Sequence, residues 1–145
     1  MFFNTALFLA AQAIMSSVEA APKIAKGNWM ELDCYVAGVK VSGNYTTAGP
    51  PQFDENGNIK FTYDWQLTWQ TCKNTYSSTA SYDNAKGRCI ANSPDGIAMP
   101  NWEKNCIQQS INGWYDVDPS TQQLSITQEP YHADYVIGHG TAWTG

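Results

Sequence analysis

Few residues in this chain carry side chains that could take part in covalent chemistry. The sequence contains two histidines, His132 and His139, and a single arginine, Arg88. No G-x-S-x-G, H-E-x-x-H or Gly-rich phosphate loop accompanies them, so the motifs of nucleophilic catalysis, zinc proteolysis and phosphate binding are missing. We therefore predict no catalytic residues and no cofactor.

One metal pair and two kinds of hydrolase remain as alternatives. His132 and Asp134 are two positions apart, so on a strand they would point the same way, but two ligands do not complete a metal site. A secreted ribonuclease would need a histidine, a glutamate and an arginine that converge on a phosphate, and a glycosidase would need two carboxyls facing each other across a cleft. The sequence brings neither set together, because Arg88 stands next to a cysteine at a strand end. A small secreted hydrolase is therefore the alternative, and no metal site is predicted.

The four cysteines, Cys34, Cys72, Cys89 and Cys106, are an even number, which favours two disulfides in a chain that enters an oxidising compartment. A zinc site is the other interpretation, but no C-x₂-C pair is present. Three connectivities are possible. We favour Cys89 with Cys106 and Cys34 with Cys72, because each pair then joins segments that the expected strands bring close.

The N-terminal segment indicates secretion. It holds an apolar run that is too short to cross a bilayer, followed by small residues at the positions before a signal-peptidase site. No second hydrophobic span follows. We predict a signal peptide at 1–20, a polar lead-in at 21–27 and a single secreted domain at 28–145.

The charge balance argues against two classes of partner. The chain has 8 Lys plus Arg against 13 Asp plus Glu, for a formal net charge of −5. Because the cations are few and scattered, they cannot provide the clustered charge that nucleic acids and anionic membranes require. We predict neither nucleic acid nor membrane as a partner.

The elements that must position these residues are mostly strands. Apolar side chains occupy every second position from Ile59 to Trp69, and the preceding Asn56-Gly57 dipeptide is typical of a hairpin turn. This pattern predicts a long bent strand over 59–71, with Tyr63, Trp65 and Trp69 at the centre of the core.

The remainder of the chain predicts an all-β domain. Short strands are expected in the segments 29–45, 75–82, 88–91, 113–117, 123–127 and 135–143, separated by turn residues. The segment 100–112 is ambiguous between a short helix and a loop. We predict a single antiparallel β-barrel or sandwich of seven to nine short strands, with at most one short helix and two disulfides.

Two kinds of surface feature are candidates for function. Trp29, Trp114 and Trp143 are not needed for the expected core and could form an aromatic binding surface. Asn44 opens an Asn-Tyr-Thr sequon ahead of a turn, which makes it a glycosylation candidate, although an unmodified asparagine at a strand end fits equally well.

The second half of the chain resembles a known family. The stretches "YSSTASYDNAKGRCIANSPDGIAMPNWEKNC", "GWYDVDPSTQQLSITQ" and "YVIGHGTA" are similar in order to the Alternaria major-allergen family of secreted fungal proteins, over roughly residues 60–145. The resemblance implies a compact β-barrel, a disulfide between Cys89 and Cys106, and the role of an effector, elicitor or allergen without catalytic residues. Cys34 and the aromatic stretch at 59–69 have no counterpart in that family.

A second resemblance is to the avidins. "GNW", "GNYTTAG" and "IGHGTAWT" are similar to the opening and closing strands of that biotin-binding barrel, but the spacing from Trp29 to Tyr45 is too short for its first hairpin. The sequence thus predicts a secreted protein that binds a host protein or a glycan without catalysis. An avidin-like or lipocalin-like barrel that holds a small ligand is an alternative, and the oligomeric state stays open.

Overall fold

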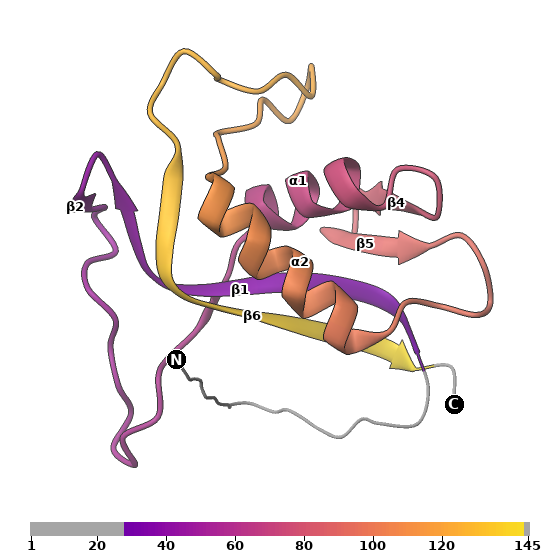
Figure 1. The fold of residues 1–145 in the computed structure, drawn as a ribbon, viewed down its shortest axis with the longest axis horizontal. Coiled ribbons are helices and arrows are strands. Elements are labelled where there is room, and N and C mark those ends of the chain that lie inside the picture. The colour runs from indigo at the N-terminus through magenta and orange to yellow at the C-terminus, as the bar shows by residue number, and fades with distance from the viewer. Residues whose placement is uncertain (1–27, 144–145) are drawn as a thin grey trace.

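The computed structural model describes residues 28–143 (Figure 1). The elements in chain order are β1 (Trp29–Val41), β2 (Asn44–Tyr45), β3 (Thr62–Tyr63), α1 (Trp65–Thr75), β4 (Ala80–Asp83), β5 (Arg88–Ala91), α2 (Met99–Asn112) and β6 (Tyr131–Trp143). The predicted signal peptide and lead-in lie outside the described residues. Neither helix of the described part has the length and apolar character that crossing a bilayer would need.

The sheet is built around β1. β6 runs antiparallel to β1 along its whole length, from Trp29 opposite Trp143 to Val41 opposite Tyr131. The first part of β1 also pairs with β5, so β5 and β6 lie on opposite edges of β1. The short strands β3 and β2 continue the β5 edge, and β4 pairs with β5 on the outside.

The connectivity of the main elements is β-α-β-β-α-β, with the strands in the order β6-β1-β5-β4. This is the arrangement of a split βαβ unit, in which neighbouring strands are antiparallel. Both helices pack on the same side of the sheet and against each other, as Figure 1 shows. The other face of the sheet is not covered by any described helix.

The predicted strand-dominated antiparallel fold with two disulfides is confirmed. The sheet is open and does not close into a barrel. In residues 28–143 it has six strands and is accompanied by two helices, compared with the prediction of seven to nine strands and at most one helix. The segment 113–127 contributes only isolated bridges in place of two strands, since it forms a loop between α2 and β6.

The predicted strand at 59–71 is wrong from Trp65 onward, where α1 begins. The side chain of Asp64 accepts a hydrogen bond from the backbone N–H of Leu67 at 2.9 Å and caps this helix. Trp65, Trp69 and Cys72 are spaced at i, i+4 and i+7, so the same residues that alternate also share a helical face. Trp69 is buried as predicted, whereas Tyr63 is 40% exposed.

The ambiguous segment at 100–112 is the second helix, α2. Pro100 stands in its first turn and Gly113 ends it at a φ of +96°. Trp102, Cys106 and Ser110 are buried at a spacing of four residues, which is the face that packs on the sheet. Gly138 of β6 allows this approach, because a Cβ there would lie 2.7 Å from the Cα of Glu103.

The disulfides connect each helix to a strand. Cys34 of β1 is bonded to Cys106 of α2, and Cys72 of α1 is bonded to Cys89 of β5. The favoured pairing of Cys34 with Cys72 and Cys89 with Cys106 is therefore wrong. It assumed that the chain before Cys72 was a strand beside β1, but that stretch is a helix lying across the sheet.

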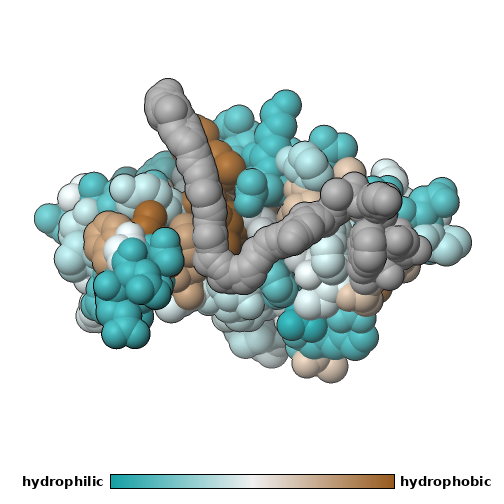
Figure 2. All heavy atoms as spheres, turned by 90° about the horizontal axis from the view of Figure 1, so that it is seen from below, coloured by the Kyte–Doolittle hydropathy of each residue, from teal (hydrophilic) through white to brown (hydrophobic). Residues whose placement is uncertain are grey.

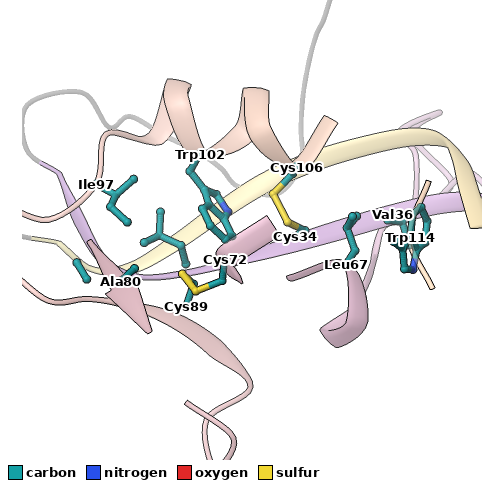
Figure 3. Packing of buried hydrophobic residues seen from close by; sticks show 12 residues of the cluster. Cys34, Val36, Leu67, Cys72, Ala80, Cys89, Ile97, Trp102, Cys106 and Trp114 are labelled. Atoms are coloured by element: carbon teal, nitrogen blue, oxygen red, sulfur yellow. A yellow bond between two sulfur atoms is a disulfide. The ribbon is translucent and has the colours of Figure 1, made fainter. Parts of the chain in front are cut away.

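The core lies between the sheet and the two helices. β1 directs its alternating residues Leu32, Cys34 and Val36 into it, and Trp102 enters from α2 with no exposed surface. Figure 3 shows both disulfides inside this layer, close to the Trp102 ring. Within the core, one disulfide thus attaches each helix to a strand of the sheet.

β1 and β6 bend together at one end of the sheet, as Figure 1 shows. Gly38 has a φ of +70°, and a Cβ at this position would lie 2.6 Å from the Pro51 ring and 2.7 Å from the Asp134 carboxylate. Only glycine meets both requirements without strain. This position of β1 therefore requires glycine.

We expect Gly38→Ala to lower the free energy of unfolding by roughly 2 kcal/mol, from backbone strain and overlap together. Gly43→Ala is the matched control, because Gly43 has a φ of +80° and a Cβ added there would have no neighbouring atom within 4 Å. Gly43→Ala should therefore lose only the part of the unfolding free energy that comes from backbone strain. Urea unfolding of both variants measures the difference, and equal losses would show that Pro51 and Asp134 do not press on Gly38.

Candidate functional site

An open surface depression lies at the bent end of the sheet. It has a volume of about 490 Å³ and is lined by Tyr45, Pro51, Phe53, Asp134 and Tyr135, which we call the aromatic groove. Its three aromatic side chains are among the most exposed large hydrophobic residues of the described chain, at 40% for Tyr45, 55% for Phe53 and 45% for Tyr135. Exposed aromatic side chains that gather in one place indicate a binding surface.

Three segments position the aromatic groove. β2 returns from β1 through a tight turn and presents Tyr45, and β6 presents Asp134 and Tyr135. Phe53 lies on a small hairpin in which it bridges to Ile59. The Asp54 carboxylate holds the hairpin turn by accepting backbone N–H groups at 2.8 and 2.9 Å. A turn is present where it was predicted, but the hydrogen bond from the Gly57 N–H to the Asp54 carbonyl puts Glu55 and Asn56 at its centre, and Gly57 follows them at a φ of +82°.

Two residues that line the aromatic groove, Tyr45 and Asp134, are paired with each other and with the neighbouring Lys40. The Tyr45 hydroxyl donates to the Asp134 carboxylate at 2.6 Å, and Lys40 Nζ lies 3.3 Å from the other oxygen of Asp134. Lys40 also stands 4.9 Å above the centre of the Tyr45 ring. The hydrogen bond to Asp134 raises the pKa of Tyr45, so its hydroxyl stays protonated. The groove thus offers aromatic faces, a donor and an acceptor without a net charge.

A second cluster lies on the sheet face turned away from the helices. Its centre is Asp33 of β1, whose side chain is only 3% exposed. One carboxylate oxygen lies 2.8 Å from His139 Nδ1 and the other accepts from Arg88 Nε at 3.2 Å. Arg88 also reaches Glu31 at 3.5 Å, and Lys86 donates to Glu31 at 2.9 Å. We call these five side chains the Asp33 cluster.

The electrostatics of the Asp33 cluster favour the ionised form of Glu31. The hydrogen bond from Lys86, together with the positive charges of Lys86 and Arg88, lowers the pKa of Glu31. Beside the cluster, the Tyr35 ring meets the His139 ring edge-on at 5.3 Å and the Tyr63 ring at 5.9 Å. Burial and the hydrogen bond with Tyr82 raise the pKa of Tyr63 far above its usual range, so Tyr63 is a neutral donor, and it donates to the carbonyl of Gly87.

The tryptophans singled out from the sequence do not form one surface. Trp114 is 1% exposed and belongs to the core, so it cannot contribute to a binding surface. Trp29 packs against Gly140, and its backbone pairs with Trp143 at the end of the β1–β6 ladder. Asn44 is exposed in β2 next to Tyr45, and its glycosylation stays a prediction.

The possible metal pair is not assembled. His132 Nδ1 lies 2.8 Å from the carbonyl oxygen of Ser110 on α2, whereas Asp134 faces Tyr45 and Lys40 in the groove. The two side chains therefore meet different neighbours despite their spacing. In the part of the chain that the structure describes, no group of three or more His, Cys, Asp or Glu side chains is arranged to hold a metal ion.

Sequence reasoning missed both the aromatic groove and the Asp33 cluster. Phe53 carried a usable signal, because it is a large aromatic residue inside a polar, Pro-rich turn region where no core position is expected. His139 carried none, since its partner Asp33 is 106 positions away.

Comparison with known proteins gives no match to a family model, to a curated protein or to a solved structure. The resemblances to the Alternaria allergen family and to the avidins therefore receive no support from these comparisons.

Proposed function

We propose that this protein is secreted and binds a neutral glycan through the aromatic groove, without chemical turnover. One observation carries the proposal: Tyr45, Phe53 and Tyr135 are each at least 40% exposed and line one depression. Aromatic rings offer flat apolar faces to the C–H groups of a sugar ring, and the paired Asp134 and Lys40 offer hydrogen bonds to its hydroxyls.

Two features support the secreted setting. Both disulfides bury their sulfur atoms in the core, and disulfides of this kind form and persist in oxidising compartments. The part of the surface that is visible and coloured in Figure 2 is mostly hydrophilic, with hydrophobic residues in a few places, which fits a protein that works in water. The role of an effector or elicitor that acts on a host or cell-wall partner is the biological form of this proposal.

A glycan fits the aromatic groove better than a small apolar ligand does. The depression is open, and its lining includes the Asp134 carboxylate and two tyrosines. The Lys40 ammonium lies 3.3 Å from that carboxylate and offsets its charge. An open sheet also lacks the interior in which an avidin-like or lipocalin-like barrel would hold its ligand. The absence of a net charge in the groove favours a neutral oligosaccharide over an acidic one.

The test is calorimetric titration of the disulfide-intact protein with a panel of neutral cell-wall oligosaccharides. We expect Phe53→Ala and Tyr135→Ala each to weaken binding by about tenfold, because each removes an exposed ring from the floor or wall of the groove. Ile126→Ala is the control: Ile126 is 68% exposed but does not line the groove, so its affinity should equal that of the wild type. Equal affinity of all three variants, or no binding to any sugar of the panel, would refute the proposal.

A further inference from the structure

The Asp33 cluster has features that a purely structural ion-pair network does not need. The buried Asp33 carboxylate fixes the His139 ring through Nδ1, so Nε2 remains as the nitrogen that can exchange a proton. His139 is 35% exposed and Arg88 is 33% exposed, so both reach solvent from a buried anchor. An aspartate that orients a histidine in this way also stabilises the imidazolium when it forms.

A second proton-transfer group, Glu31, lies on the same face of the β1–β6 pair as His139. Glu31 and Asp33 are two positions apart on β1 and share one face, and His139 is directly opposite Asp33 on β6. Glu31 and His139 are therefore diagonal neighbours, for which about 7–8 Å between positions is typical. Arg88 contacts both Glu31 and Asp33, so its guanidinium lies along the same side of this pair. A base and an acid separated by such a distance, with a guanidinium beside them, suit in-line displacement at phosphorus.

We propose that the Asp33 cluster is an acid–base site that cleaves single-stranded RNA by internal phosphoryl transfer. The choice of RNA follows from what the cluster lacks and what surrounds it. None of its five side chains is a serine, threonine or cysteine nucleophile, whereas RNA carries its own nucleophile, the 2′-hydroxyl. The Tyr35 ring next to His139, and the Tyr63 ring that contacts Tyr35, provide aromatic faces on which unstacked bases can lie.

The reaction balances without a further reactant. The Glu31 carboxylate removes the proton of the 2′-hydroxyl, and the 2′-oxygen forms a bond to phosphorus. The bond from phosphorus to the 5′-oxygen breaks, and the leaving oxygen takes a proton from Nε2 of the His139 imidazolium. The products are a 2′,3′-cyclic phosphate and a 5′-hydroxyl, while Arg88 and Lys86 offset the charge on the phosphoryl oxygens.

The overall charge limits the substrate. The sequence-based prediction of no nucleic-acid partner depends on the net charge of −5, which disfavours long polyanions. The Asp33 cluster nevertheless places Lys86 and Arg88 next to each other around Glu31. We therefore expect short substrates to be cleaved better, per phosphodiester, than long ones. This site is separate from the aromatic groove, and its activity does not require glycan binding.

The test uses the full secreted protein with both disulfides intact. It is incubated with dinucleoside monophosphates, with single-stranded RNA and with DNA of the same sequence, and the product ends are identified by mass spectrometry. We expect cleavage of RNA to 2′,3′-cyclic phosphates and no cleavage of DNA, which has no 2′-hydroxyl. Glu31→Gln and His139→Asn should each reduce the rate 10²- to 10⁴-fold. The asparagine amide keeps a donor near Asp33 but removes Nε2, so the variant should remain folded.

Two comparisons make the result decisive. Ile111→Ala, an exposed site on α2, should keep the full rate. Glu31→Gln and His139→Asn should unfold in urea within about 1 kcal/mol of the wild type and should bind oligosaccharide unchanged, which separates this proposal from the glycan proposal. No cleavage by the wild type, or equal cleavage by His139→Asn prepared in the same way, would overturn the proposal.

Discussion

Replacing both Cys34 and Cys106 with alanine is expected to lower the free energy of unfolding by roughly 4 kcal/mol, most of the stability that a domain of this size has. The two residues are separated by 72 positions, so their bond removes a large amount of chain entropy from the unfolded state. Both side chains are fully buried, and the bond attaches α2 to the central strand. Urea unfolding of the variant against the wild type measures the loss.

The other disulfide is the matched control. Cys72 and Cys89 are separated by 17 positions, so their double alanine variant should lose roughly 3 kcal/mol. Peptide mapping without reduction should recover Cys34 with Cys106 and Cys72 with Cys89. A smaller loss for the Cys34/Cys106 variant than for the Cys72/Cys89 variant, or the recovery of a peptide joining Cys89 to Cys106, would contradict the observed connectivity.

Replacing Trp102 with alanine is expected to cost about 3–5 kcal/mol of unfolding free energy. The side chain has no exposed surface and fills the layer between α2 and the sheet (Figure 3). It also packs against the Tyr76 ring at 5.5 Å, and its indole Nε1 donates to the carbonyl of Asp33 at 2.8 Å. Thermal and urea unfolding of the variant measure this loss.

Trp102→Phe separates packing from the hydrogen bond. Phenylalanine retains much of the ring volume but leaves the Asp33 carbonyl without its donor, so we expect a smaller loss of about 1–3 kcal/mol. Because that carbonyl belongs to the residue at the centre of the Asp33 cluster, the variant should also change the environment of His139. Equal stability of Trp102→Ala and wild type would show that this side chain is not part of the core.

The sequence defined the strands better than the helices, and the reason is local. β1, β5 and β6 are bounded by turns or alternate in hydrophobicity, so their positions could be predicted from neighbouring residues. α1 could not, because its residues satisfy the two-residue and the 3.6-residue periods at once. Asp64 favours the helix, because its carboxylate accepts a hydrogen bond from the backbone N–H of Leu67 in the first helical turn, and a strand would offer no such bond.

The error in the predicted disulfide connectivity followed from the prediction of this one segment as a strand. With α1 treated as a strand, Cys72 would lie beside Cys34 on the sheet. In the folded chain the helix turns Cys72 toward β5, and Cys34 is left facing α2. The number of disulfides can be predicted from the cysteine count and the compartment, whereas their pairing depends on which cysteines the fold brings together.

The two candidate sites were beyond sequence reasoning because each joins distant segments. Tyr45 and Asp134 are 89 positions apart, and Asp33 and His139 are 106 apart. The antiparallel pairing of β1 with β6 brings Asp33 to His139, and together with the β1–β2 pairing it brings Tyr45 to Asp134. The register between two such strands depends on the packing of the complete sheet, so it cannot be predicted from the sequence of either segment alone.

The aromatic groove is tested most directly by NMR titration of the full-length protein with the tightest-binding neutral oligosaccharide of the panel. The largest shift changes should fall on Tyr45, Phe53 and Tyr135, with smaller changes at Lys40 and little change along α2. Changes centred on α2, or a saturating titration that leaves the three aromatic residues unaffected, would contradict the assignment of this groove as the binding surface.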